Sequence, residues 1–241
     1  MQRRGPRGGR PSLPRRLAAG IASIIVAERM GPGRLLDSGI AALDRALRAV
    51  LAPARTSRSI PTVDTEPAEP LSEADRRTSA ALMRVNHAGE LAAQALYHGQ
   101  ALVARSESTR AMLLATARSE SDHLAWCETR LSELAARPSL LNPLWYMGSF
   151  LIGASAALLG DRASLGFVAE TERQVEGHLD EHLDRLPAGD TRSRAILEAM
   201  RGEEIAHGAA AAAAGGVRPP APVCALMRRT ARIMTGSAYW I

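Results

Sequence analysis

The motif Glu-x-x-His occurs twice in this chain, as Glu120-Ser-Asp-His123 and as Glu204-Ile-Ala-His207. Both copies lie in long segments rich in alanine and leucine, which favour helix, and neither segment alternates as a strand would. Residues three apart share one face of a helix, with about 5–6 Å between their Cβ atoms, so each glutamate and its histidine can reach a common ion. A single copy is more typical of acids on a solvated surface. Its repetition in a second helix favours a binding site.

A further glutamate precedes each motif by about one helix. Glu90 lies 30 residues before Glu120, and Glu172 lies 32 residues before Glu204. One glutamate from each of two helices and a Glu-x-x-His from each of two others form the ligand set of carboxylate-bridged di-iron or di-manganese bundles. Carboxylates and imidazoles suit iron or manganese rather than a thiolate metal, whereas four inward carboxylates without metal would repel and lose their hydration. We therefore predict a metal site formed by Glu90, Glu120, His123, Glu172, Glu204 and His207.

The pattern of breaks and caps predicts an all-α fold. A short helix over 37–51, with Asp37 and Ser38 as caps, precedes a proline-rich polar linker over 52–71. Ser72 with Glu73 and Asp75 then begins a sustained helical region. Four of its helices are long enough for a bundle. The helices are predicted at about 72–105, 108–136, 144–160, 161–186, 190–214 and 222–236.

The positive charge is confined to the start of the chain. Residues 1–35 hold eight arginines and one acid, a local charge of +7, although the whole chain carries only +5. Three interpretations stay open: a secretory signal without a clear cleavage site, an organelle transit peptide, or a disordered extension, for which one origin is an artefact of an upstream start codon. A nucleic-acid or membrane-surface binder using this arginine-rich segment is a further hypothesis. The acidic remainder and the 3% aromatic content argue against nucleic acid.

Composition also limits the fold. The two cysteines, Cys127 and Cys224, form no Cys-x-x-Cys, which excludes a disulfide scaffold and a structural zinc finger. We predict three parts: an extension over 1–35, a short helix with its linker over 36–71, and the bundle domain over 72–241.

Residues 138–160 contain no charge over 23 positions. This length suits a bilayer crossing, but Asn142-Pro143 is expected to break the stretch, so that only about 17 residues after it can form a continuous helix. Two interpretations are about equally favoured: a buried helix of the bundle, or an element that dips into one leaflet with Trp145 and Tyr146 at the headgroups.

Five stretches carry a family resemblance: MRVNHAGELAAQALYHGQAL, ESDHLAWCE, RPSLLNPLWYMGSF, GFVAETERQVEGHL and EEIAH. Together they closely resemble the demethoxyubiquinone hydroxylase family, in its bacterial form, over about residues 37–241. The resemblance implies a ferritin-like four-helix bundle with additional membrane-interacting helices. The family's ligand positions fall on the same six residues that the spacing identifies.

The resemblance also implies an activity. The protein is expected to use two iron ions per subunit and dioxygen to hydroxylate the ring of a polyprenylated 3-methyl-6-methoxy-1,4-benzoquinol. Electrons are expected from the reduced quinol or an external donor, because the chain has no nicotinamide fingerprint. Further expectations are peripheral attachment to the cytoplasmic face of a bacterial inner membrane and contact with a second copy or other ubiquinone-biosynthesis proteins. The alternative is a ferritin-like iron-oxidising or iron-storing protein without an organic substrate.

Residues close to the six ligands receive other roles. His178 is predicted to lie in an outer shell near the substrate. Glu170, two positions from Glu172, is expected at the surface or in an outer shell, and Glu203 is expected to be a neighbour rather than a ligand. Packing or surface roles are predicted for His87, His98, His182 and Cys127.

Overall fold

The computed structural model describes residues 32–62 and 70–241, and the chain divides between Ala41 and Ala42 into two units. Within the described residues there are helices and no strands, which confirms the all-α prediction. Helix α2, Pro32–Leu51, starts five residues earlier than expected, so Asp37 and Ser38 lie inside it and do not cap it. Most of the predicted extension, residues 1–31, lies outside the described residues.

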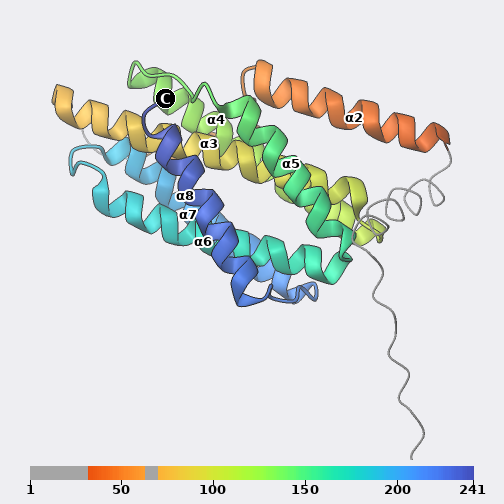
Figure 1. The fold of residues 1–241 in the computed structure, drawn as a ribbon. Helices are drawn as coiled ribbons and strands as arrows, with labels where there is room; N and C mark the ends of the chain where they lie inside the picture. Colours follow the sequence, from red (N-terminus) through yellow and green to blue (C-terminus); the bar gives the residue numbers. More distant parts are fainter. Residues whose placement is uncertain (1–31, 63–69) are drawn as a thin grey trace, which may run out of the picture. The chain divides into compact units, whose positions relative to one another are not determined.

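Four long helices form the bundle of the second unit (Figure 1). Helix α3 packs against α4 and α6, and α7 packs against the same two helices, which closes the ring of four. Short links join α3 to α4 and α6 to α7, so each pair is an antiparallel hairpin. The bundle helices are α3 (Glu73–Val103), α4 (Glu107–Glu133), α6 (Asp161–Arg185) and α7 (Thr191–Ala213).

Side-chain caps define where these helices begin. The Ser72 hydroxyl accepts a hydrogen bond from the Asp75 amide at 3.1 Å, as the sequence predicts. Helix α4 is capped by Ser106, whose hydroxyl accepts from the Thr109 amide at 3.2 Å, so this helix begins slightly before its predicted start. Both caps satisfy backbone donors that the first turn leaves without a partner.

The bundle core has two apolar parts, one towards each end. One part gathers leucine, isoleucine and methionine side chains with Trp126, and the other surrounds the fully buried Tyr97. The first includes Leu82, Leu131, Leu179, Ile196 and Met200, and the second includes Leu113, Val168 and Ala211. On each of the four helices, the predicted metal-ligating residues lie between these two parts. The bundle therefore encloses a polar band at mid-length.

Two more helices cover the bundle. Helix α5, Asn142–Leu158, packs closely on α3, because an added Cβ at Gly99 would overlap the Phe150 carbonyl oxygen and one at Gly153 would overlap the Leu96 carbonyl oxygen. Pro143 lies in its first turn, so Asn142-Pro143 divides the uncharged stretch as predicted and leaves a helix of 17 residues. Helix α8, Ala221–Ala238, packs on α3 and α6.

The uncharged helix α5 is neither wholly buried nor long enough to span a membrane. Leu144, Met147 and Leu151 are more than half exposed, so the interpretation of a fully buried helix is wrong for this face. In the parts of the chain that the structure describes, no helix combines the length and the apolar character that a bilayer crossing requires.

Candidate metal centre

The six residues that the sequence predicts as ligands meet at mid-length of the bundle. Glu90 comes from α3, and Glu172 comes from α6, while α4 and α7 each supply one Glu-x-x-His pair. Five of the six are buried to 3% exposure or less, and the side chain of His207 is 19% exposed. Carboxylates at this depth require a compensating partner, since burying an isolated charge costs roughly several kcal/mol of folding free energy.

Three carboxylate oxygens surround one nitrogen of His123. Its Nδ1 atom lies 3.2 Å from Glu90 Oε2, 3.2 Å from Glu120 Oε2 and 3.0 Å from Glu204 Oε1. A ring nitrogen carries one hydrogen at most, so it satisfies only one of these acceptors. The ligand atoms of all four residues lie within 4.8 Å of one another. One cation among them would be shared by all four groups.

A second set of four residues adjoins the first. It consists of Glu120, Glu172, Glu204 and His207, with His207 Nδ1 at 3.5 Å from both Glu120 Oε1 and Glu204 Oε2. Glu120 and Glu204 belong to both sets. Two carboxylates that are common to two sets are suited to bridge two ions.

Several oxygen and nitrogen atoms of the cluster that could bind a metal ion have no hydrogen-bond partner. Buried atoms without one include Glu120 Oε1, Glu172 Oε2, Glu204 Oε1 and His207 Nδ1. Burying an unsatisfied polar group costs about 1–3 kcal/mol, so four of them in one place indicate a missing common partner. Oxygen and imidazole donors are those of iron and manganese sites. The residues present therefore fit two divalent ions.

Burial and the neighbouring charges shift the pKa values of the cluster residues strongly. Burial, followed by neighbouring carboxylates, raises the pKa of Glu172 well above its ordinary value, and burial likewise raises the pKa of Glu90. Although burial opposes it, contact with Glu120 and Glu204 raises the pKa of His207 to about 10. The cluster therefore retains protons that bound cations would displace, which makes metal affinity pH-dependent.

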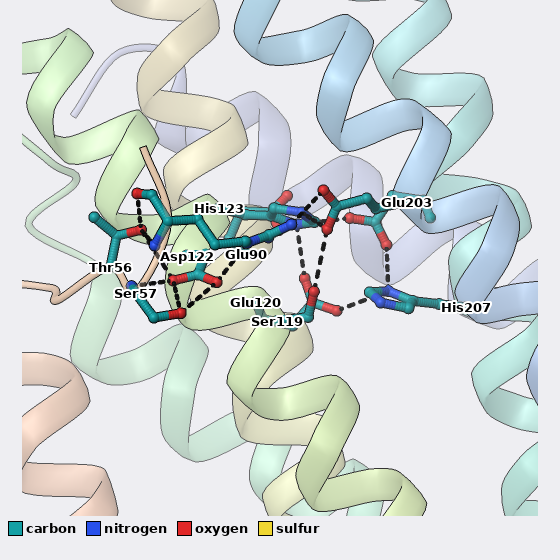
Figure 2. Close-up of polar contacts among 11 residues, drawn as sticks. Thr56, Ser57, Glu90, Ser119, Glu120, Asp122, His123, Glu203 and His207 are labelled. Carbon is teal, nitrogen blue, oxygen red and sulfur yellow. Dashed lines mark hydrogen bonds and ion pairs between the residues drawn. The ribbon is translucent and has the colours of Figure 1, made fainter. Parts of the chain in front are cut away.

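Two contacts of the cluster were missed by the sequence analysis. The Tyr97 hydroxyl donates to Glu172 Oε1, and Tyr97 is fully buried. Its position seven residues after Glu90, two helical turns along the same face, was an available signal. Glu203, expected only as a neighbour, accepts a hydrogen bond from His123 Nε2 at 3.1 Å (Figure 2). A pattern confined to one helix could not reveal this contact between α4 and α7.

Glu170 lies away from the cluster, as expected from its angular separation from Glu172. Its expected surface position is wrong, because its side chain is 1% exposed beneath Arg173 and Arg218. The hydrogen bond from Arg173, against the effect of burial, lowers the pKa of Glu170 to about 2. This carboxylate thus has its own cation.

The remaining histidines lie outside the two sets. His87 is buried and contacts Asn142 at 3.3 Å, as expected of a packing residue, while His98 is buried against Tyr146. His182 is also buried, and its Nδ1 donates to Asn86 Oδ1 at 2.8 Å. Cys127 is fully buried against Met200 and fills space as predicted.

A cavity of about 1150 Å³ adjoins the cluster among α3, α5, α6 and α8. Glu90 forms part of its wall, and so do Asn86, His178 and His182. The His178 ring lies against the His182 ring, tilted by 56° with 3.9 Å between ring centroids, and its Nε2 atom is buried without a partner. Apolar side chains cover most of the remaining wall, among them Leu96, Trp145, Ile152, Phe167 and Val175. The cavity therefore combines a polar group beside the cluster with an apolar interior.

A bundle of four helices that encloses two carboxylate–histidine sets with two common glutamates defines the class of ferritin-like proteins with a carboxylate-rich metal centre. Comparison with known sequences identifies one family within this class. The chain belongs to the family of the ubiquinone biosynthesis protein COQ7, whose family model matches residues 77–238.

Curated relatives of the chain carry one enzyme name. The 3-demethoxyubiquinol 3-hydroxylase of Ralstonia pickettii is 58% identical over 217 residues, which cover 86% of this chain and all of the relative. The enzyme of the same name from Cupriavidus necator is 58% identical, and that from Burkholderia multivorans is 55% identical, each over 207 residues and with the same coverage.

Proposed function

We propose that this chain is a monooxygenase of ubiquinone biosynthesis, a 3-demethoxyubiquinol 3-hydroxylase, with iron held by the six residues of the cluster. Its relatives, which match over their whole length, carry that name. One observation of the structure links the name to the site. Glu90 belongs both to the cluster and to the wall of the 1150 Å³ cavity, so a bound ring can approach the metal ligands.

Glu90, Glu120, His123 and Glu204 would hold one iron ion, and Glu120, Glu172, Glu204 and His207 would hold the other. When loaded, such a centre supplies the reduction of dioxygen, with one oxygen atom entering the ring and the other leaving as water. The two electrons come from the reduced quinol or an external donor. The protein's own part is to hold the ligands and to position the ring.

The cavity residues give the substrate an orientation. Asn86 accepts from His182, and His178 presents an unpartnered Nε2 atom, so the polar groups of the ring find partners on the wall that also holds Glu90. An apolar cavity of about 370 Å³ shares Ile152, Phe167 and Val223 with the larger one. This apolar continuation suits a polyprenyl chain, because burial of apolar surface favours binding.

The exposed apolar face of α5 supports attachment to a membrane surface. Leu151 is 58% exposed on this uncharged helix, and Leu159, directly after the helix, is 78% exposed. Both also line the smaller cavity. A substrate with a polyprenyl chain resides in the bilayer, so the cavity must open towards it. We propose peripheral attachment to the cytoplasmic face of a bacterial inner membrane. A second copy or other ubiquinone-biosynthesis proteins are the expected partners.

A deletion strain tests this function. Without the gene, the demethoxy precursor should accumulate and ubiquinone should disappear, and the wild-type chain should restore ubiquinone. Glu204→Ala should fail to restore it, with iron lost from a protein that stays helical. Glu198→Ala, an exposed glutamate on the same helix α7, is the matched control and should restore it.

Two results would contradict the proposal. Normal ubiquinone in the deletion strain, in the absence of a second hydroxylase, would favour the iron-storage alternative. Full iron content and full turnover of Glu204→Ala would remove the ligand assignment.

A further inference from the structure

A segment outside the bundle helices is bound to the outer side of α4. The Ala54 amide donates to Glu128 Oε2 at 2.8 Å, and the Ser57 amide donates to Asp122 Oδ1 at 2.7 Å. The Thr56 hydroxyl donates to the same oxygen at 3.0 Å. Residues 54–58 are therefore fixed on α4 directly beside His123.

Arg58 ends this segment and contacts two helices at once. Its Nε donates to Asp122 Oδ2 at 2.7 Å on α4, and its Nη1 donates to Glu203 Oε1 at 2.6 Å on α7. The guanidinium carbon lies 4.7 Å from the centre of the Trp126 ring, which in turn lies 5.3 Å from the His123 ring. A planar guanidinium can make these three contacts together, whereas an ammonium cannot.

Glu203 connects Arg58 to the cluster. While its Oε1 accepts from Arg58, its Oε2 accepts from His123 Nε2 at 3.1 Å and from the Ser119 hydroxyl at 3.2 Å. Figure 2 shows this succession of contacts from Thr56 and Ser57 through Asp122 to Glu203 and His123. The opposite nitrogen of the His123 ring faces the three cluster carboxylates.

We propose that Arg58 is a positioning residue of the metal centre. It acts through Glu203 to hold the His123 ring so that Nδ1 faces the other three residues of the first set. This proposal rests on the proposed function, because it assumes that His123 binds metal. It extends the centre to a segment that precedes the bundle and contributes no ligand.

The chemistry of metal-bound histidine supports this role. A ligating imidazole must keep its ligating nitrogen free of hydrogen, and a carboxylate that accepts from the other nitrogen fixes this tautomer and increases the ring's basicity. Glu203 can do so only while its carboxylate stays beside the ring. Arg58 holds it there through the hydrogen bond to Oε1 at 2.6 Å. Without Arg58, a side chain that is 29% exposed would be free to turn into solvent.

Arg55 provides a matched control. It is an exposed arginine three residues earlier on the same segment, and it takes part in none of the contacts described for Arg58. Arg55→Gln and Arg58→Gln remove the same charge from almost the same place. Any general effect of net charge on cation binding must therefore appear in both variants.

Co²⁺ binding to the full-length metal-free protein tests the proposal. The affinity is measured by competition with a chromophoric chelator, and the geometry of the site is monitored by the visible absorption of bound Co²⁺. Arg58→Gln should weaken the binding to the site that contains His123 by about tenfold, within the range typical of outer-sphere changes, and should alter its absorption. Arg55→Gln should match the wild type. Arg58→Lys should fall between the wild type and Arg58→Gln, since it can donate to only one of the two carboxylates.

A double-mutant cycle separates positioning from simple attachment of the segment. If Arg58 acts through Glu203, the pair Arg58→Gln/Glu203→Gln should bind Co²⁺ no more weakly than Glu203→Gln alone. Additive losses would overturn the proposal, and so would wild-type affinity and absorption in Arg58→Gln. Failure of the wild-type protein to bind two Co²⁺ ions would instead refute the proposed metal centre.

Discussion

The contact between α3 and α5 predicts that Gly99→Ala destabilises the protein, although alanine is the better helix former. A Cβ at Gly99 would overlap the Phe150 carbonyl oxygen and lie 2.9 Å from the Ala154 amide nitrogen. Both are backbone atoms of α5, so the strain cannot be relieved by a side-chain rotation. Helix α5 would have to move away from α3 as a unit.

Two opposing terms set the magnitude. Replacing glycine by alanine inside a helix gains about 0.5–1 kcal/mol, whereas forcing extra volume into a packed contact costs about 1–3 kcal/mol or more. Because the overlap involves backbone on both sides, the cost wins, with a net loss of about 1–2 kcal/mol. In a domain of this size each kcal/mol shifts Tm by about 2–4 °C. The expected decrease is therefore roughly 2–8 °C.

Thermal unfolding of Gly99→Ala beside Gly89→Ala measures this directly. Gly89 lies on the same helix with nothing within 4 Å of its added Cβ, so it should show only the gain, with a Tm at or slightly above that of the wild type. Metal content of Gly99→Ala should be unchanged, because α5 contributes nothing to the cluster, while turnover should fall because α5 forms part of the cavity wall. A Tm for Gly99→Ala equal to that of Gly89→Ala would refute the reasoning.

Three further outcomes are expected. The raised pKa of His207, about 10 in the folded metal-free protein, stabilises that protein most below pH 6.5. The stabilisation is lost as the pH rises, so the free energy of unfolding should fall by up to about 4 kcal/mol between pH 7 and 10. Denaturation of His207→Gln should show a smaller fall but keep part of it, because carboxylate partners also raise the pKa of His123 despite its burial. No lysine titration complicates the comparison, because the chain has none. Tyr97→Phe leaves a buried Glu172 oxygen without its donor and should cost about 1–3 kcal/mol in urea unfolding of the metal-free protein, so an unchanged midpoint would contradict the role given to that hydroxyl. Leu151→Asp should reduce sedimentation with anionic vesicles, whereas deletion of residues 1–35 should leave it intact, and the opposite pattern would make the extension the anchor.

Much of the bundle could be predicted from the sequence, because the signals that begin and end its helices lie in neighbouring residues. Ser72 at the start of α3 and Pro187 after α6 mark helix ends through nearest-neighbour chemistry. The meeting of Glu90 and Glu172 with the two motifs at mid-length was also predictable, since similar spacings of 30 and 32 residues within the two hairpins place them at similar depth. Their role as metal ligands is still a prediction.

The parts that were missed depend on contacts between helices. Glu203 and Tyr97 each contact a residue of a different helix, and the spacing along one helix contains no information about such a partner. Glu170 was misplaced because arginines from elsewhere in the chain cover it.

The distribution of the two four-residue sets has a consequence for the order of assembly. The first set takes three residues from the α3–α4 hairpin and one from the α6–α7 hairpin, and the second takes one and three. Neither hairpin completes a set alone, so during synthesis a full site arises only after both hairpins have docked. Ions held by the proposed centre would act as a reversible crosslink between the hairpins, because a ligand at a hundred times its Kd adds about 2.7 kcal/mol to the docked state. Chelation should accordingly increase hydrogen exchange first along the seam between the hairpins, while the helices within each hairpin keep their protection.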